Sequence, residues 1–405
     1  MRTGVFILCL LAGTFYNSAA QVGEEPGSLT AKSQQVSLDS LFKIVEEYNP
    51  RLRTAASSLE SSRLRSGTGL TPSDPEVEFG YLAGFPSSVG NRIDFRVSQE
   101  FEFPTVYMHK AKAKDIEIEE AEQVYALTRQ EVLLKAIQLW IERIYLNELE
   151  AMLEERLKSS EQLLAQYKKL AESGESSQLA LSQVNLQAVV LRGEREELRG
   201  DIKVNSEALS EVSGGKIYDS GEKVFPEIIV PELDILLKAY ENDPRMKYYS
   251  SEVRLMEVGK QLAISQSLPT FTAGYYSETV IDQRFRGVAV GLSIPLWENT
   301  RKVKLAKAEI IHAGDRMEEY KSRQQTELSQ KQARRETLKR QLNDLRQAVL
   351  MINDEALLGV ALDLGEISLS EYFYNSELYF QNMRKLLQYQ KDLLMLEADL
   401  LKVLY

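Results

Sequence analysis

The chain has 405 residues and a formal net charge of −11, with 43% hydrophobic and 27% charged residues. This composition is typical neither of a disordered chain nor of a helical membrane protein. An acidic chain without a basic block is also poorly suited to bind phosphate backbones, so we expect no nucleic-acid partner.

The first twenty residues are predicted to be a signal peptide. Arg2 supplies a positive start, residues 5–11 form a short apolar core, and residues 18–20 fit the small-x-small rule for cleavage before Gln21. A membrane anchor is the alternative, but the apolar run is too short to span a bilayer. Cys9 is the only cysteine, so the exported chain would have no thiol for a disulfide, a zinc site or a nucleophile.

The rest of the chain is predicted to be two copies of one unit, because several residues recur at nearly constant offsets. The recurring pairs are Asn49-Pro50 with Asp243-Pro244, Pro104 with Pro295, and Gly174 with Gly365. The first pair is offset by 194 residues and the other two by 191. Such offsets indicate an internal repeat. We therefore predict a first repeat over 21–213, a linker over 214–230 that packs against the middle, and a second repeat over 231–405.

Each repeat is predicted to start with a helix of roughly 30 residues, followed by two strands. The strands are expected at about 75–104 and about 270–295. Apolar residues alternate with polar ones there, as in Val77 and Phe79 beside Glu78, which gives one apolar and one wet face. Strands of this kind suit a membrane barrel, and a half-buried hairpin in a soluble sheet is the alternative.

The strands are followed by predicted helical hairpins, over about 105–213 and about 296–405. Apolar residues recur there at alternating spacings of four and three, which is the a/d pattern of a coiled coil. One example is Leu338, Leu342, Leu345, Val349 and Ile352. Residues 105–171 would form a helix of roughly 100 Å. The helix over 37–70 and the return helix over 178–213 have together about the same length, so they are expected to stack end to end beside it.

Four strands cannot close a barrel, and an open edge is not viable in lipid. Three copies would supply twelve strands, an even number wide enough for a channel, and cyclic symmetry would leave no free edge. The alternation and the repeat therefore favour a chain that associates.

In its motifs and in the duplication itself, the sequence resembles the TolC-type outer-membrane efflux family. The resemblance covers the whole chain after the signal peptide. It rests on Asn49-Pro50, on Ser293-Ile294-Pro295-Leu296-Trp297 before a basic helix start, and on the glycines Gly174 and Gly365. The sequence departs from the family at residues 106–108 and 298–300, where better-known members often have glycine.

The resemblance implies a mainly α fold with a membrane β-barrel part, in which the unit of helix, strand hairpin and long helix is duplicated. Three chains would form a twelve-stranded β-barrel in outer-membrane lipid, continuous with a long coiled-coil α-barrel in the periplasm of a Gram-negative bacterium. The implied function is the passive exit channel of a tripartite efflux or export system, docked on a periplasmic adaptor protein and an inner-membrane pump.

The resemblance also implies where a gate would lie, because acidic residues follow the glycine of the turn in this family. Here Glu371 lies six residues after Gly365, whereas the matching position of the first repeat is Ala180. A solvated helix face is the alternative for Glu371. The candidates for the tip and gate are Glu371, Glu366, Glu175, Gly174 and Gly365. The candidates for adaptor contact are Ser173, Ser176, Ser177, Ile367 and Ser368. The alternation of the strands places Asp94, Glu100 and Glu102 in the barrel lumen.

Two other classes of protein were weighed. A periplasmic structural or adaptor coiled-coil protein would explain the heptads and the signal peptide, but not four alternating strands at fixed places. An exported enzyme would need a site, and neither His109 nor His312 is accompanied by a His/carboxylate or metal-ligand cluster. We therefore expect no catalysis, no cofactor and no metal site.

Overall fold

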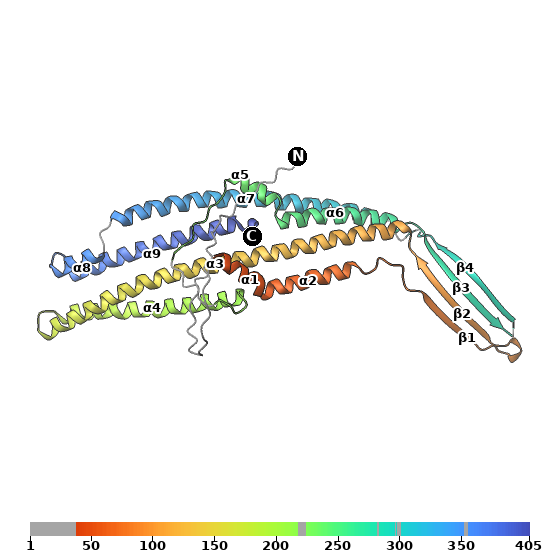
Figure 1. Ribbon diagram of the computed structural model, residues 1–405, viewed down its shortest axis with the longest axis horizontal. Helices are drawn as coiled ribbons and strands as arrows, with labels where there is room; N and C mark the ends of the chain where they lie inside the picture. The colour runs from red at the N-terminus through yellow and green to blue at the C-terminus, as the bar shows by residue number, and fades with distance from the viewer. Residues whose placement is uncertain (1–37, 218–223, 282, 296, 298–300, 352–354) are drawn as a thin grey trace, which may run out of the picture. The chain divides into compact units, whose positions relative to one another are not determined.

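The computed structural model describes residues 38–217, 224–281, 283–295, 297, 301–351 and 355–405 (Figure 1). The predicted signal peptide lies outside them. In the first half of the chain the elements are α1 (Leu38–Tyr48), α2 (Pro50–Ser66), β1 (Glu76–Leu82), the 3-10 turn η1 (Ser87–Val89), β2 (Arg92–Phe101), α3 (Pro104–Glu172) and α4 (Gln178–Val212). In the second half they are α5 (Leu233–Glu241), α6 (Pro244–Ser265), β3 (Thr270–Val280), β4 (Gln283–Ser293), α7 (Lys302–Met351), α8 (Glu355–Asp363), α9 (Leu369–Leu400) and the 3-10 turn η2 (Lys402–Leu404).

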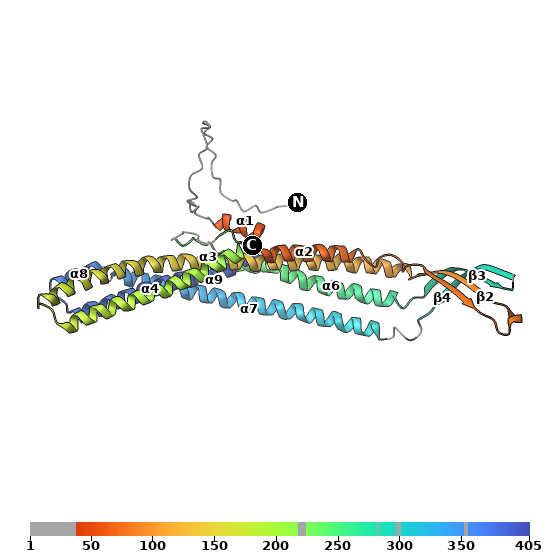
Figure 2. The same cartoon turned by 90° about the horizontal axis from the view of Figure 1, so that it is seen from below.

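The 69-residue helix α3 runs beside two shorter helices of the same half. α2 packs on the part nearer the strands and α4 on the part that leads to Gly174, so the two follow one another along α3 (Figures 1 and 2). In the second half, α6 and α9 are placed along α7 in the same way. α3 also contacts α6 and α9 of the second half. The two halves are therefore joined along most of α3.

One of the predicted helices is interrupted. The helix expected over 37–70 is two helices, α1 and α2, because Asn49 has extended backbone angles (φ −63°, ψ 123°) and Pro50 has no N–H to continue the helical hydrogen bonds. The first arm of the hairpin expected over about 296–405 is described as α7 and α8, and residues 352–354 between them lie outside the described chain.

The recurring Asn49-Pro50 and Asp243-Pro244 pairs form the joints between the short helices. The Asn49 side chain accepts a hydrogen bond from the Leu52 N–H (3.0 Å) and donates one to the Val212 carbonyl at the end of α4 (2.7 Å). Asp243 accepts from the Arg245 N–H (3.1 Å) and from the Tyr320 hydroxyl (3.2 Å). Each cap is buried, so the joint is fixed both to the next helix and to a neighbouring one.

The four strands form one antiparallel sheet in the order β1-β2-β3-β4. Register pairs Phe79 with Phe95, Phe95 with Ser277, and Ser277 with Arg286. Because β1 and β4 have one neighbour each, both edges of the sheet carry unpaired backbone groups in a single chain.

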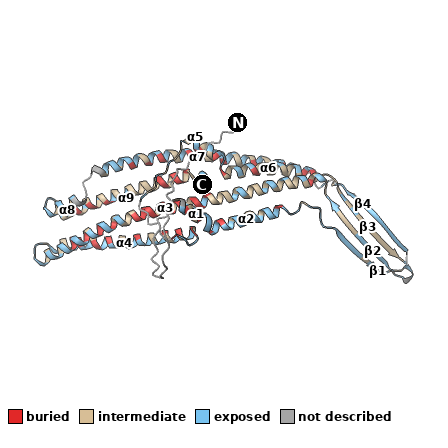
Figure 3. Ribbon diagram, viewed as in Figure 1, coloured by how far each residue is buried: buried red, intermediate tan, exposed pale blue. Residues whose placement is uncertain are grey.

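One face of the sheet is almost wholly apolar or uncharged. Directly paired residues point to the same face, and the register places these residues together: Val77, Phe79, Tyr81, Ile93, Phe95, Val97, Gln99, Phe101, Phe271, Ala273, Tyr275, Ser277, Thr279, Val288, Val290 and Leu292, with Arg284 and Arg286. We call this set the apolar face. No residue of the four strands is buried (Figure 3), and the exposed fraction of Val288 reaches 85%.

Buried side chains concentrate instead where the helices meet midway between the strands and the hairpin ends (Figure 3). The core there includes Leu41 of α1, Ile137 and Ile141 of α3, and Ala398 of α9, all at most 2% exposed. The described parts of the linker reach this core, since Ile217 is one of its members and Phe225 packs against it. No helix of the described chain is both long enough and apolar enough to cross a membrane.

Candidate functional site

Each half of the chain has a turn between two antiparallel helices, and these turns (residues 173–177 and 364–368) are the hairpin turns named below. Gly174 and Gly365 have positive φ angles of 80° and 71°, which glycine adopts without strain. In the first turn, the N–H groups of Glu175 and Ser176 both donate to the Leu170 carbonyl (2.8 and 3.1 Å). In the second, those of Glu366 and Ile367 both donate to the Ala361 carbonyl (2.9 and 3.4 Å).

A serine then starts the return helix in both turns. The Ser177 hydroxyl accepts from the Ala180 N–H (3.1 Å), and the Ser368 hydroxyl accepts from the Glu371 N–H (3.2 Å). The backbones of the two turns are therefore equivalent at the 191-residue offset found in the sequence. The serine caps could have been predicted from their position three residues after each glycine.

The turns differ in one side chain. The Glu371 carboxylate accepts from the Ser368 N–H (2.8 Å), which completes a capping box that Ala180 cannot form. This backbone hydrogen bond, with the one between Glu371 and the Ser368 side chain, lowers the pKa of Glu371 below its ordinary value. The candidate gate residue is thus an exposed, ionised carboxylate with a defined structural role in its own helix.

The two hairpins are held to one another by a small apolar core. Leu163 and Leu164 of α3, Val184 of α4 and Tyr372 of α9 are buried in it. Ile367, a candidate for adaptor contact, packs against this core and is half-buried. The other candidates differ in exposure: Ser173, Ser177, Ser368, Glu175 and Glu366 are exposed, and Ser176 is half-buried.

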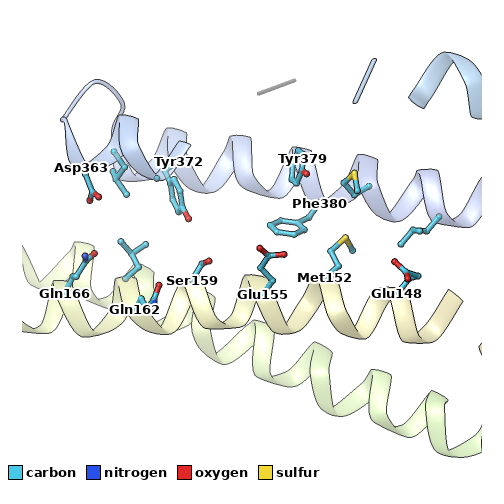
Figure 4. A pocket seen from close by; sticks show the side chains of 15 residues that line it. Glu148, Met152, Glu155, Ser159, Gln162, Gln166, Asp363, Tyr372, Tyr379 and Phe380 are labelled. Atoms are coloured by element: carbon cyan, nitrogen blue, oxygen red, sulfur yellow. The ribbon is translucent and has the colours of Figure 1, made fainter. Parts of the chain in front are cut away.

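A groove of about 630 Å³ runs between α3 and the second hairpin just behind the turns. Figure 4 shows Met152, Glu155 and Ser159 of α3 facing Tyr379 and Phe380 of α9 across it. Carboxylates, amides and aromatic rings share this lining, so the groove is amphipathic. Among the described residues, no group of three potential ligands is placed to hold a metal ion.

Arg156 lies beside this groove and was missed by the sequence analysis. Its side chain is 6% exposed, forms an ion pair with Glu377 of α9 and lies 4.5 Å from the centre of the Phe380 ring. Partial burial alone would raise the pKa of Glu377, but the hydrogen bonds from Arg156 and Gln381 lower it. The sequence signal that could have revealed Arg156 is its charge at a core-facing position of the apolar stripe of α3, where a buried arginine needs a partner.

The other face of the sheet, which we call the charged face, carries Asp94 and Glu100, two of the three candidate lumen residues. Arg96 pairs with Glu78 (3.2 Å) and lies over the Tyr276 ring (4.7 Å). The face also carries small residues, including Gly80, Gly274, Gly287, Ala289 and Gly291. Glu102 differs from the other two candidates because it follows the end of β2 and forms an ion pair with Lys110 of α3.

A further carboxylate pair lies between α3 and α6. Burial and, to a smaller extent, the neighbouring charges of Glu252, Glu117 and Glu119 raise the pKa of Glu120 to about 7, against the opposing effect of Arg254. Glu120 Oε1 and Glu252 Oε2 are each buried and have no hydrogen-bond partner among the described residues. The other Glu252 oxygen pairs with Arg316 of α7 (2.5 Å).

Comparison with known proteins reveals the same fold in several outer-membrane channels. The CmeC outer membrane channel of Campylobacter jejuni has a TM-score of 0.76 and 15% identity, with 95% of this chain and 93% of that chain covered. A membrane protein from Pseudomonas aeruginosa has a TM-score of 0.77 and 16% identity, with 98% and 100% covered. The outer membrane protein VceC of Vibrio cholerae has a TM-score of 0.72 and 14% identity, with 91% and 95% covered. No protein-family model and no curated sequence matches the chain.

At these identities the likeness establishes the fold. The fold that the sequence resemblance implied is therefore confirmed: a mainly helical chain with very long helices and a four-stranded antiparallel sheet, arranged as in the outer membrane channel CmeC. The chain therefore shares its fold with outer-membrane channels.

Proposed function

We propose that this chain is the outer-membrane exit channel of a tripartite efflux or export system, in which three copies form a passive duct. The sheet is the observation that carries the proposal. Its apolar face is exposed, its charged face is lined by paired charges and small residues, and both of its edges are unpaired. In a closed barrel in lipid, the apolar face would contact the acyl chains, the charged face would line an aqueous lumen, and each edge strand would pair with an edge strand of another copy.

Three copies would pair β4 of each chain with β1 of the next and so close twelve strands. The charged face would then line the lumen, with Asp94 and Glu100 in it, and the apolar face would contact outer-membrane lipid. The helices would continue the duct into the periplasm and end at the hairpin turns. A periplasmic coiled-coil protein, the alternative, would leave an uncovered apolar sheet in water, which soluble proteins avoid.

Disulfide crosslinking tests the closure directly. Because Cys9 is the only native cysteine, a cysteine in place of Phe79 can be combined with one in place of Val288, Val290 or Leu292 in turn. We expect at least one pair to give covalent trimers in outer-membrane fractions. The control pair, Val97→Cys with Tyr275→Cys, joins directly paired residues of β2 and β3 and should stay at monomer mass. A chain that fractionates with soluble proteins, or that never crosslinks beyond a monomer, would contradict the proposal.

The gate is proposed at the hairpin turns, with Glu371 as an acidic ring of three. Glu371→Gln removes the charge but keeps a residue that serves in capping boxes, so the helix start should survive. Single-channel recordings in planar bilayers should show reduced cation selectivity for Glu371→Gln. Glu366→Gln, one residue after the glycine, measures the contribution of the second candidate. Unchanged selectivity in Glu371→Gln would contradict a gate role for this residue.

The same turns are proposed as the contact with a periplasmic adaptor protein, which in turn would join an inner-membrane pump. Their equivalent backbones and exposed serines support this assignment. A photo-crosslinking residue in place of Ser176 or Ser368 should capture an adaptor in cells, whereas one in place of Thr54, on α2 near the middle, should not. Capture from Thr54 alone would place the contact elsewhere.

A further inference from the structure

Two arginines interrupt the apolar face of the sheet. Arg284 and Arg286 alternate with the residues of β4 that point to the charged face, and the register places them in line with Thr279 and Ser277. They are the only charged residues on the apolar face of the four strands. Both are exposed, and no hydrogen bond or ion pair joins either guanidinium group to another described residue.

Their place along the sheet is at the end away from the helices. The row of residues that ends in Arg284 includes Ile93, whereas the row next to the helices includes Phe101. Eight residues separate Ile93 and Phe101 along β2, or roughly 27 Å at about 3.4 Å per residue. The apolar band of an outer-membrane barrel is about 25 Å tall, so Arg284 lies near its far boundary. Arg286 lies one row nearer the helices, roughly 7 Å along the strand, from where a long arginine side chain can extend to that boundary.

A second copy of the chain offers these arginines no counter-charge on the apolar face. The edge strand that would pair with β4 is β1, whose residues on that face are Val77, Phe79 and Tyr81. The acidic residues of β1, Glu76 and Glu78, point to the charged face. Closing the barrel would therefore leave two cations per chain at the lipid boundary without a carboxylate beside them on any strand.

We propose that Arg284 and Arg286 bind the phosphate of a phosphorylated lipid headgroup in the outer leaflet. This inference rests on the proposed function, which places the far end of the sheet at the outer surface. Guanidinium groups bind phosphate with two parallel hydrogen bonds. The hydroxyl groups of Ser277 and Thr279, directly paired with the two arginines, supply further hydrogen-bonding groups. Phe79, Phe95 and Tyr81 lie on the same face and provide the apolar surface for the acyl chains.

The test uses the full-length chain purified in a non-ionic detergent and a glycolipid that carries two phosphates. Each arginine near an anionic lipid surface contributes roughly fivefold in affinity. We therefore expect the double variant Arg284→Gln/Arg286→Gln to bind the glycolipid about thirtyfold more weakly. The matched control is Arg92→Gln/Arg96→Gln, which removes the same charge from the charged face and should change the affinity less than twofold.

Two further probes identify what is recognised. The same glycolipid without its phosphates should bind wild type and the double variant equally, and inorganic phosphate should fail to compete at millimolar concentration. Full competition by inorganic phosphate would overturn a lipid site in favour of a simple anion site. If the cysteine pairs give covalent trimers but Arg284→Gln/Arg286→Gln binds the glycolipid as tightly as wild type, this inference alone is overturned. A chain that forms no trimer in detergent would overturn the proposed function as well.

Discussion

The sheet and the middle of the helical part differ in how a single chain covers their side chains. In the middle, Ile141 and Ile144 of α3 are completely buried by helices of the same chain. In the sheet, Val288 and Val290 of β4 are more than 80% exposed. The helical part thus folds around its own core, whereas the sheet has an exposed apolar surface that only a partner or a lipid phase can cover. The following predictions test this difference.

The largest effect is expected at the buried ion pair between α7 and α9. Arg335 Nε lies 2.7 Å from Glu397 Oε1, and their side chains are 10% and 5% exposed. Arg335→Met leaves the Glu397 carboxylate buried without this partner, which typically costs about 3–5 kcal/mol. Urea unfolding of the detergent-solubilised chain, followed by circular dichroism, measures the loss. The double variant Arg335→Met/Glu397→Leu should regain most of it, and a double variant as unstable as the single one would contradict the pairing.

Truncation of one β-branched residue in each region compares the two regions. Ile141→Ala in the helical core should lower the free energy of unfolding by about 3 kcal/mol, because it leaves a cavity in a site with no exposure. Val290→Ala in the sheet should cost less than about 1 kcal/mol, since Val290 packs against little of its own chain. Equal losses in the same urea experiment would show that the sheet is as self-supporting as the core.

A smaller effect is expected at the joint between α1 and α2. Asn49→Ala removes both the cap on Leu52 and the bond to the Val212 carbonyl, and should cost about 2 kcal/mol. Asn49→Asp keeps the capping oxygen but loses the donor to Val212, so its loss should be smaller. Thermal unfolding of the two variants beside wild type measures the difference. An Asp variant less stable than the Ala variant would contradict this expectation and show that a buried carboxylate beside the Val212 carbonyl costs more than the cap on Leu52 contributes.

The smallest effect depends on pH and involves Glu120. Its pKa of about 7 in the folded chain exceeds the ordinary value of 4.5, so folding favours the protonated form. That contribution to stability is complete below pH 4.5 and is lost as pH rises to about 7. Glu120→Gln should therefore be more stable than wild type at pH 8, by about 1 kcal/mol after solvent screening at this half-exposed site, and nearly equal to it at pH 4.5. Thermal unfolding at the two pH values checks this, and a pH-independent difference would refute it.

Much of the fold followed from the sequence, because the repeat and the residue periods are local signals. The alternation around Phe79 and Phe95 predicted the strands, and Gly174 and Gly365 predicted the hairpin turns. The prediction of one helix over 37–70 was wrong because the periodicity outweighed Pro50, although the Asn-Pro pair is itself a helix-start signal. The matching Asp243-Pro244 pair is likewise a helix-start signal, and α6 begins at Pro244.

The polar contacts between the halves were beyond sequence reasoning. Arg156 and Glu377 are 221 residues apart, and nothing local to either residue indicates the other. The burial of Glu120 likewise depends on the packing of α6 against α3. Glu102 was assigned to the lumen by alternation alone. However, β2 ends at Phe101, and the Glu102 carboxylate forms an ion pair with Lys110 near the start of α3. Which of the tip residues meets another protein stays a prediction.

The two hairpin turns have one more consequence, which concerns stoichiometry. Each chain presents the same turn backbone twice but the Glu371 carboxylate only once. In a ring of three chains, a partner that recognises the backbone would find six equivalent places, and a partner that recognises the charge would find three. Counting the subunits bound per ring therefore reveals which of the two features the partner recognises.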